Sequence, residues 1–553
     1  MDLGVPLPPP VATVSEPFNV AQLVEENARR RGDARALTEP HGAGWRHVTY
    51  RELQQRIERE HAALAHAGLR GGDKVSVFVR PSIDWVVLIY ALFRLGAQPV
   101  LIDPAMGRAG VLRCVERMAP RGFVGIPLAC ALKLVFPAAF RSVEVSLVHG
   151  ALPLGGSTLS SLRRASRAVP APAATRADDA AAVLFTSGST GPAKGVPYTH
   201  GMFRAQVAAL QELYAMREGD VDVACFAPFA LFGPALGLST VLPEIDFSHP
   251  ARAKPENVVR ALREQRAVQC FGSPAIWRRV APWARERGIV LEHLERLMIA
   301  GAPVHPPLIE DCLSILGAHG DVHTPYGATE SLPVSSMNGR AVLAEHRART
   351  ESGWGNCVGR PASSIAARVI RISDEPIEEW NDSLCVQRGE PGELVVKGAQ
   401  VTREYEQEPA HTAAAKIREG QAVWHRMGDI VREDDAGRLW FVGRKSHRVE
   451  SASGTLYPVA IENIFNTHRS VRRSALVGIG ARGSQEPVLV VELKSVAHAS
   501  DTLARELLAH GHRNPATRLV TRVLFHESFP VDVRHNAKID RPELARWAAE
   551  QPR

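Results

Sequence analysis

A segment of small hydroxyl residues and glycines that ends in a lysine is the most informative part of this 553-residue sequence. It runs from Thr186 to Gly195 and follows an apolar run, 181–185, that is typical of a buried strand. Glycines let backbone N–H groups approach an anion closely, hydroxyls add donors, and Lys194 adds a positive charge. The spacing is not that of a Walker loop, so we predict a phosphate-binding loop of another type, with a flexible Ser/Gly turn as the alternative. The residues expected to bind phosphate are Thr186, Ser187, Gly188, Ser189, Thr190, Gly191 and Lys194.

Seven other short segments stand in an order that resembles the ANL superfamily of adenylate-forming enzymes. That superfamily includes acyl-CoA synthetases, peptide-synthetase adenylation domains and luciferases, and its signature loop is similar to the loop described above. A single match would mean little, but seven in the family's order make the resemblance specific, and it covers nearly the whole chain. The segments are 49–53, 96–100, 301–304, 326–330, 426–429, 443–445 and 536–541.

The resemblance implies a reaction that joins a substrate carboxylate to the α-phosphate of ATP and expels pyrophosphate. Both reactants are anions, so the site must supply cations and hydrogen-bond donors where negative charge develops. By the resemblance, Glu330 binds Mg²⁺ and Thr329 contacts the α-phosphate, although a Thr-Glu pair alone is more typical of a helix start. The adenine site is expected to comprise Gly301, Ala302, Pro303, Tyr326 and Gly327, with the tyrosine ring against the base.

Three more residues receive roles from the same resemblance. Asp429 corresponds to the carboxylate that accepts hydrogen bonds from the ribose hydroxyls; the alternative is an ordinary turn aspartate in a Gly-Asp pair. Arg444, fifteen residues further on, is expected to reach the ribose or a phosphate. Lys538 corresponds to the lysine that bridges the carboxylate and the α-phosphate, and the alternative is a surface lysine in a flexible tail.

The position of this lysine implies two domains. We predict an N-terminal adenylate-forming domain, residues 1–443, and a mobile C-terminal domain, residues 444–553, that carries Lys538. In the family the small domain rotates after adenylation about a residue just after the Gly-Arg pair. That residue is Ser446 here, where relatives usually have Asp or Lys, and a hinge residue needs only to absorb a backbone change.

Three departures from the family weaken the case for coenzyme A as acceptor. The segment that commonly contains a histidine before an aromatic residue in acyl-CoA synthetases is apolar here, 228–234. Glu450 stands where a lysine is common, in a stretch that swings into the site in thioester-forming relatives. Ala460 replaces the first acidic residue of the usual Pro-x-Glu-x-Glu ending, which leaves Glu462.

Two apolar stretches could form the walls of an acyl pocket, 226–238 and 271–277, with ordinary core packing as the alternative. The wall residues predicted from them are Phe229, Phe232, Gly233 and Gly272. A third apolar stretch, 128–140, could meet lipid or a partner protein, but we expect it to pack in the core. His200, just past the phosphate loop, is a candidate base, although a structural role suits it better.

The elements that must position these residues follow an α/β pattern. Helical periods alternate with short β-branched runs, such as 74–79 and 99–102, and this alternation predicts a largely parallel sheet. The first fifteen residues are expected to form an extended arm, and 155–182 a surface connection. The alternation continues to about Val369, and strands at 392–398 and 439–442 indicate a β-rich part. The last 110 residues should contain a strand at 487–493 and a helix at 501–509.

We therefore expect an α/β fold: two α/β subdomains and a β-rich lobe in a large N-terminal domain, with a small mobile α+β lid. The longest apolar run, 85–93, is too short to span a bilayer, and no signal core is visible, so we expect a cytoplasmic protein without an integral membrane segment. The net charge is +7, and the sequence contains no basic run of the kind that is typical of nucleic-acid binding. Seven scattered cysteines without a CxxC spacing favour buried free thiols.

The motif variants resemble most the olefin β-lactone synthetases of bacterial long-chain hydrocarbon biosynthesis. Those enzymes adenylate a β-hydroxy fatty acid, whose own hydroxyl then displaces AMP to close a β-lactone. The resemblance implies ATP and Mg²⁺ as cofactors, a β-hydroxy fatty acid as substrate and assembly with other enzymes of that pathway. The alternative is a long-chain fatty acyl-CoA or acyl-carrier-protein ligase. A non-catalytic scaffold is disfavoured, because Glu330, Asp429, Arg444 and Lys538 are all present.

Overall fold

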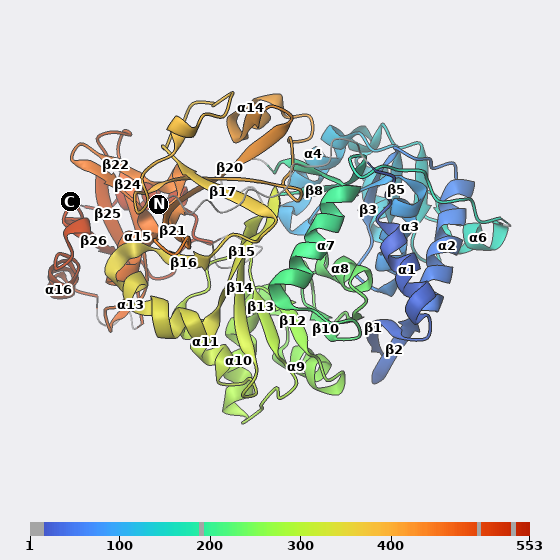
Figure 1. Cartoon of the computed structure of the whole chain (residues 1–553), viewed down its shortest axis with the longest axis horizontal. Coiled ribbons are helices and arrows are strands. Elements are labelled where there is room, and N and C mark those ends of the chain that lie inside the picture. The colour runs from blue at the N-terminus through green and yellow to red at the C-terminus, as the bar shows by residue number, and fades with distance from the viewer. Residues whose placement is uncertain (1–15, 167, 187–192, 495–498, 532–537, 553) are drawn as a thin grey trace, which may run out of the picture.

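The computed structural model describes residues 16–166, 168–186, 193–494, 499–531 and 538–552. The predicted phosphate-binding residues Ser187, Gly188, Ser189, Thr190 and Gly191 lie outside the described residues, as do residues 1–15. In Figure 1 the chain runs from a blue α/β part at the right, through a green and yellow α/β part below the centre and a yellow-orange lobe above it, to a red C-terminal part at the left.

The first α/β subdomain is a seven-stranded sheet in the order β7-β6-β5-β3-β4-β8-β9. All neighbouring strands are parallel except β8 and β9, which form an antiparallel pair on either side of the phosphate loop. The strands are β3 (Lys74–Phe78), β4 (Gln98–Leu101), β5 (Gly122–Gly125), β6 (Val145–Val148), β7 (Ser157–Thr158), β8 (Ala180–Phe185) and β9 (Gly195–Thr199). The helices are α2 (Tyr50–His66), α3 (Ile83–Leu95), α4 (Gly107–Met118), α5 (Pro127–Val135) and α6 (Leu159–Ala165).

Two of the motif segments are helix ends in this subdomain. Thr49 begins α2 with a capping box, in which its hydroxyl accepts from the backbone of Glu52 and the Glu52 carboxylate accepts from the backbone of Thr49. Gly96 ends α3 in the left-handed region at φ +73°, where a Cβ would lie 2.9 Å from the side chain of Ala173. These segments therefore fix the helices that flank the first sheet.

The second α/β subdomain is an eight-stranded sheet in the order β15-β14-β13-β12-β10-β11-β1-β2. Its inner strands are parallel, and each edge is an antiparallel hairpin, β14–β15 and β1–β2. The strands are β1 (Arg35–His41), β2 (Gly44–Thr49), β10 (Val221–Ala224), β11 (Ser239–Val241), β12 (Gln269–Gly272), β13 (Arg296–Ile299), β14 (Asp321–Ala328) and β15 (Ser331–Asn338). The helices are α1 (Ala21–Arg31), α7 (His200–Tyr214), α8 (Phe229–Ala235), α9 (Pro255–Glu264), α10 (Pro274–Glu286), α11 (Pro306–Leu313), α12 (Gly339–Ala341) and α13 (Arg347–Arg349).

The β-rich lobe is an antiparallel sheet in the order β16-β21-β20-β18-β17, with β19 paired to β20. It begins at Asn356, before the expected limit near Val369, because β16 pairs with β21. Its elements are β16 (Asn356–Gly359), β17 (Ile365–Ile370), β18 (Gly392–Gly398), α14 (Pro409–Ala415), β19 (Lys416–Glu419), β20 (Ala422–Glu433) and β21 (Leu439–Arg444). Arg444 is the last residue of β21, so the strand that holds it belongs to this lobe.

The C-terminal part is a small α+β unit, as expected. A three-stranded sheet, β24-β25-β26, and a two-stranded sheet, β22-β23, pack with three helices. The elements are β22 (Val449–Ser451), β23 (Gly454–Leu456), α15 (Pro458–Phe465), β24 (Val471–Ile479), β25 (Glu486–Leu493), α16 (Asp501–Gly511), β26 (Arg522–Phe525) and α17 (Arg541–Ala549). The division at residue 443 and the mobility of this unit stay predictions.

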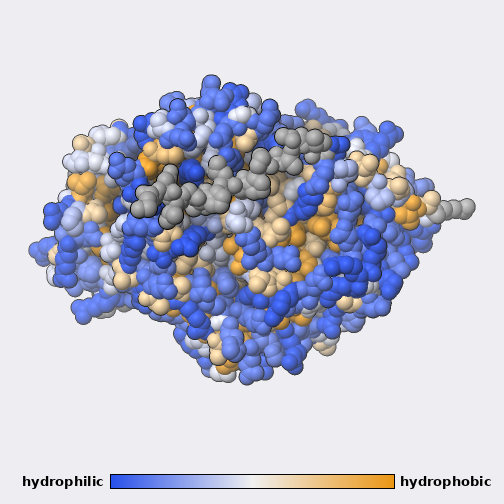
Figure 2. Space-filling model, in the orientation of Figure 1, coloured by the Kyte–Doolittle hydropathy of each residue, from blue (hydrophilic) through white to orange (hydrophobic). Residues whose placement is uncertain are grey.

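The stretch 155–182 is largely exposed, as expected of a surface connection, and it contains β7 and α6 before its irregular part. One local expectation was wrong. The stretch 128–140 is not wholly core, because Leu128, Leu134 and Val135 on α5 are 75%, 57% and 68% exposed. The face in Figure 2 is mostly hydrophilic, with an apolar area close to where Figure 1 labels α7 and α8.

The cysteines agree with the expectation of buried free thiols. All seven cysteines are free, and six of them are buried. Within the described ranges, no helix combines the length and apolarity needed to cross a membrane.

Candidate functional site

A cavity of about 1760 Å³ lies where the two α/β subdomains, the β-rich lobe and the C-terminal part meet. Residues far apart in the sequence line it together. The predicted site residues on its wall are Thr186, Lys194, Gly301, Ala302, Pro303, Tyr326, Gly327, Thr329, Glu330, Asp429, Arg444, Ser446 and Lys538. The fold therefore brings every described nucleotide-site residue of the sequence prediction to one cavity.

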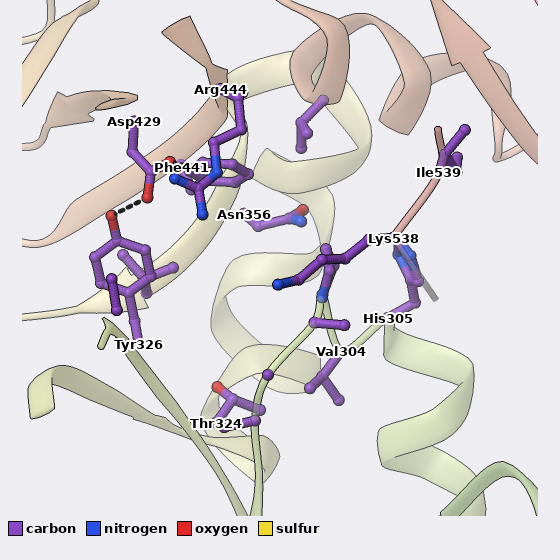
Figure 3. A pocket seen from close by; sticks show the side chains of 18 of the residues that line it. Val304, His305, Thr324, Tyr326, Asn356, Asp429, Phe441, Arg444, Lys538 and Ile539 are labelled. Atoms are coloured by element: carbon purple, nitrogen blue, oxygen red, sulfur yellow. Dashed lines mark hydrogen bonds and ion pairs between the residues drawn. The ribbon is translucent and has the colours of Figure 1, made fainter. Parts of the chain in front are cut away.

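One wall of the cavity carries a tyrosine, a carboxylate and an arginine in contact (Figure 3). The Tyr326 hydroxyl donates to Asp429 Oδ2 at 2.5 Å, and Arg444 Nε lies 3.0 Å from Asp429 Oδ1. Asp429 and Arg444 are directly opposite each other in the β20–β21 pairing, which explains their separation of fifteen residues. Burial raises the pKa of Asp429, while the charge of Arg444 and the hydroxyl of Tyr326 lower it. The arrangement presents a buried carboxylate whose orientation is fixed from two sides.

Thr329 and Glu330 form the two-residue turn of the β14–β15 hairpin, since Ala328 pairs with Ser331. The helix start considered as an alternative is thus absent at this pair. The turn is anchored on both sides: the Tyr198 hydroxyl donates to the carbonyl oxygen of Thr329 at 2.5 Å, and the Tyr405 hydroxyl donates to Glu330 Oε1 at 2.6 Å. The Glu330 carboxylate therefore stands at a fixed place on the cavity wall.

Gly327 has a packing reason to be glycine. A Cβ at this position would lie 2.7 Å from the carbonyl oxygen of Ser331, at the irregularity in the β14–β15 pairing. A larger residue at this position would therefore push the two strands of the hairpin apart.

The described ends of the phosphate loop are joined to each other. The backbone N–H of Thr186 donates to the carbonyl oxygen of Lys194 at 3.0 Å, and the N–H of Lys194 donates to Thr186 Oγ1 at 3.2 Å. The ammonium group of Lys194 lies 4.9 Å from the ring centroid of Tyr405. Tyr405 therefore contacts both residues, with its ring beside the Lys194 ammonium group and its hydroxyl bound to Glu330.

Lys538 enters the cavity from the C-terminal part. Figure 3 shows its side chain reaching inward beside Val304 and His305, with the ammonium group directed into the pocket. Its charge contributes to lowering the pKa of Asp429 against the effect of burial. The C-terminal part thus supplies a cation to the cavity that Glu330 and Asp429 line.

A hard cation such as Mg²⁺ is usually held by one or two carboxylates together with substrate phosphates. Glu330, fixed on the wall near Lys194, fits that pattern. In the part of the chain that the structure describes, no three His, Cys, Asp or Glu side chains are grouped to hold an ion. A metal here would therefore be shared between Glu330 and the nucleotide.

Three of the four predicted acyl-wall residues do not line the cavity. Phe229 does, and its ring stacks on Phe271 with centroids 3.6 Å apart. Phe232 instead stacks on Phe203, and a Cβ at Gly233 would lie 1.7 Å from Thr240 Oγ1. A Cβ at Gly272 would lie 2.8 Å from Trp277 Nε1. Phe232, Gly233 and Gly272 thus pack in the core, which apolar character alone does not reveal. Phe226, Phe271, Ala275 and Met298 line the cavity beside Phe229.

His200 has the structural role that was the alternative to a base. Its side chain is fully buried at the start of α7, and Nδ1 accepts the backbone N–H of Val20 at 3.1 Å. Burial lowers its pKa to about 4. It is also not among the described residues that line the cavity.

The segment after β21 is held by buried charges. Lys445 Nζ lies 3.0 Å from Glu393 Oε1, and Arg426 Nη2 lies 2.6 Å from Glu393 Oε2. Ser446 follows in a short 3₁₀ turn, Lys445–His447. Glu450 accepts from Arg448 Nε at 2.8 Å, so its negative charge is used within the C-terminal part.

Sequence reasoning missed Tyr405, which lines the cavity, and Lys416, the first residue of β19, which lies beside Tyr405. Lys416 is buried, donates to Thr402 Oγ1 at 3.0 Å and lies 5.8 Å from the ring centroid of Tyr405. Burial lowers the pKa of Lys416 to about 7, against the charges of Glu330 and Glu404. The sequence signal was a lysine that ends the alanine run after Thr412, within a stretch that no motif covers.

Comparisons of this chain with known proteins show the family to which it belongs. A model of the AMP-binding enzymes matches residues 24–406. A protein of Stenotrophomonas maltophilia (strain K279a) named olefin beta-lactone synthetase is 43% identical over 97% of this chain and 99% of its own length. A protein of Xanthomonas campestris with the same name is 42% identical over 96% and 98%. A 4-chlorobenzoate–CoA ligase of Arthrobacter is 28% identical over 87% of each chain.

Solved structures agree in fold. The anthranilate CoA ligase AuaEII, in complex with anthranoyl-AMP, has a TM-score of 0.78 at 19% identity and covers 97% of this chain and 98% of its own. The amide bond synthetase McbA from Marinactinospora thermotolerans has a TM-score of 0.78 at 22% identity, covering 96% and 100%. The expected α/β fold is confirmed.

Proposed function

Because this chain belongs to the family of AMP-binding enzymes and is an ATP-dependent adenylate-forming ligase, we propose that it forms a β-lactone from a long-chain β-hydroxy fatty acid. The acid is first activated as an acyl-AMP, and the acyl-AMP then closes on its own hydroxyl with loss of AMP. The observation that carries the proposal is the likeness, over nearly the whole chain, to two relatives named olefin beta-lactone synthetase.

The nucleotide site supports the first half-reaction. Asp429 presents two oxygens that can accept from the ribose hydroxyls, and Arg444 stabilises its charge. Tyr326, bound to the same carboxylate, offers a ring against the adenine base. Gly301, Ala302 and Pro303, which have small side chains or none, line the same cavity. These contacts are equal in ground and transition states, so they serve affinity for ATP and AMP.

The charges at the reacting phosphate support the same step. Lys194 and Lys538 provide cations for a reaction between two anions, and Thr329 stands on the turn that faces them. Glu330 would hold Mg²⁺, which when bound neutralises charge on the phosphates. The substrate carboxylate oxygen attacks the α-phosphorus, the bond to the bridging oxygen breaks, and pyrophosphate leaves. Lys538 would bridge the attacking carboxylate and the α-phosphate.

The second half-reaction needs no external acceptor. The β-hydroxyl oxygen attacks the acyl carbonyl carbon, the bond from that carbon to the phosphate oxygen breaks, and AMP leaves with the electron pair. The hydroxyl proton passes to the phosphate of the leaving AMP and reaches the solvent with it. A tethered nucleophile in attack geometry can contribute roughly 7–11 kcal/mol in favourable cases. The apolar wall formed by Phe226, Phe229 and Phe271 suits an alkyl chain and the exclusion of water.

Product analysis tests the proposal. The purified protein is incubated with ATP, Mg²⁺ and a long-chain β-hydroxy acid, with and without coenzyme A, and the products are identified by mass spectrometry. We expect a β-lactone, AMP and pyrophosphate whether or not coenzyme A is present. An acyl-CoA that forms only when coenzyme A is added, without any lactone, would make the protein an acyl-CoA ligase.

A further inference from the structure

The segment 402–408 crosses from the metal-site turn to the end of the phosphate loop, and we call it the strap. At one end the backbone N–H of Thr402 donates to the carbonyl oxygen of Glu330 at 2.9 Å. At the other end the N–H of Glu406 donates to the carbonyl oxygen of Gly195 at 2.8 Å. The strap therefore joins two parts of the site that are more than 130 residues apart in the sequence.

Tyr405, in the middle of the strap, contacts both charged groups. Its hydroxyl donates to Glu330 Oε1 at 2.6 Å, and its ring lies 4.9 Å from Lys194 Nζ. The residue is 6% exposed. Burial and the neighbouring Glu330 carboxylate raise the pKa of Tyr405 above its usual value.

The strap is itself held in place on both sides. Lys74 Nζ lies 2.6 Å from Glu406 Oε1, and Arg117 forms an ion pair with Glu408. Arg117 also donates to the carbonyl oxygen of Ala193, directly before Lys194. Lys416 donates to Thr402 at its other end. A segment of loop fixed by three cations is rigid enough to orient the groups that it touches.

We propose that Tyr405 is a positioning residue that fixes the Glu330 carboxylate and the Lys194 ammonium group relative to each other before the metal-bound nucleotide enters. The inference rests on the proposed function, because it takes Glu330 as the metal ligand and Lys194 as a phosphate ligand. Partners that orient metal ligands through hydrogen bonds contribute much to metal affinity, and their loss typically weakens it about 10–100-fold. An ammonium group over an aromatic face is attracted to the electron-rich ring, so the Tyr405 ring restrains Lys194 as well.

Two substitutions separate the two contacts. Tyr405→Phe removes the hydroxyl from Glu330 but keeps the ring beneath Lys194, whereas Tyr405→Leu removes both. Tyr90→Phe is the matched control, because Tyr90 is fully buried and its hydroxyl donates to a backbone carbonyl, that of Leu231, at 2.5 Å. Thermal unfolding of the three variants shows whether the loss of a buried hydroxyl has the same structural effect in each.

The readout is binding, measured with Mn²⁺ as probe by electron paramagnetic resonance in the presence of ATP, and with ATP alone by calorimetry. We expect Tyr405→Phe to bind Mn²⁺ about 10-fold more weakly than the wild type while binding metal-free ATP normally. Tyr405→Leu should also bind metal-free ATP more weakly, and Tyr90→Phe should match the wild type. Unchanged Mn²⁺ binding in Tyr405→Phe would overturn the inference. Absence of ATP binding by the wild type would instead overturn the proposed function.

Discussion

Asp429 and Arg444 are directly opposite residues of two neighbouring strands, and their side chains meet with Oδ1 and Nε 3.0 Å apart. The pairing of β20 with β21 thus places a buried carboxylate and its counter-ion on the cavity wall as a unit. The Tyr326 hydroxyl donates to the same carboxylate from β14, a strand of the eight-stranded sheet. A ribose that enters the cavity would meet a carboxylate already oriented by a hydrogen bond from Tyr326 and an ion pair with Arg444.

Asp429→Ala should weaken binding of both ATP and AMP, because the ribose contacts exist in ground and transition states alike. We expect a loss of about 2–3 kcal/mol, since a charged acceptor is removed and Arg444 loses its partner. Calorimetric titration with each nucleotide measures the effect. If the substitution lowered the maximal rate and left both affinities unchanged, the ribose role of Asp429 would be wrong.

Glu330→Gln should raise the concentration of Mg²⁺ needed for half-maximal pyrophosphate release, because a neutral amide is a poor ligand for a hard cation. The amide still accepts from the Tyr405 hydroxyl, so the fold of the turn should persist. Titration of the rate with Mg²⁺ at saturating ATP gives the shift. A wild-type metal requirement in this variant would remove Glu330 from the metal site.

Lys538→Ala should slow adenylation by about 10²–10³-fold, the typical cost of one contact to charge that develops in the transition state. ATP binding should be nearly unaffected. Pyrophosphate release and ATP affinity are measured together, with Lys133→Ala, a lysine on α5, as the control. Near-wild-type pyrophosphate release would contradict the role of this lysine.

His200 predicts how stability depends on pH. Its pKa is about 4 in the folded protein, against 6.5 for an ordinary histidine, so the unfolded chain binds the proton more readily. The contribution of His200 to the free energy of unfolding is complete above about pH 6.5 and is lost as the pH falls toward 4. His200→Asn keeps an acceptor for the Val20 N–H but does not titrate.

The check is urea unfolding of both proteins at pH 7.5 and pH 5. Relative to His200→Asn, the wild type should lose about 2 kcal/mol of unfolding free energy between these pH values. If the difference in unfolding free energy between the wild type and His200→Asn were the same at both pH values, His200 would not be buried in its neutral form.

The sequence identified the residues that lie in motifs, and it could not identify the residues that hold them. Glu330 and Asp429 stand in short segments with a typical order, so their place in one cavity could be predicted. Tyr405 touches Glu330 across 75 residues, and only the folded path of the strap brings the two together. No local pattern signals such a contact.

The acyl wall shows the same limit in another form. Apolar composition predicted that α8 and β12 are buried, but it did not tell which side faces the cavity. Phe229 lines the cavity, whereas Gly233 packs against Thr240 and Gly272 against Trp277. Conversely, Leu128 on α5 is apolar and yet 75% exposed, so apolar composition did not predict its burial.

The most direct test of the account follows oxygen atoms through the reaction. A β-hydroxy acid with ¹⁸O in both carboxylate oxygens is converted with ATP, and AMP and lactone are analysed by mass spectrometry. If the carboxylate is adenylated and the hydroxyl then attacks the carbonyl, AMP carries one ¹⁸O and the lactone carries one, in its carbonyl. A lactone with two ¹⁸O atoms and an unlabelled AMP would mean that the hydroxyl group is the one activated, and would contradict the account.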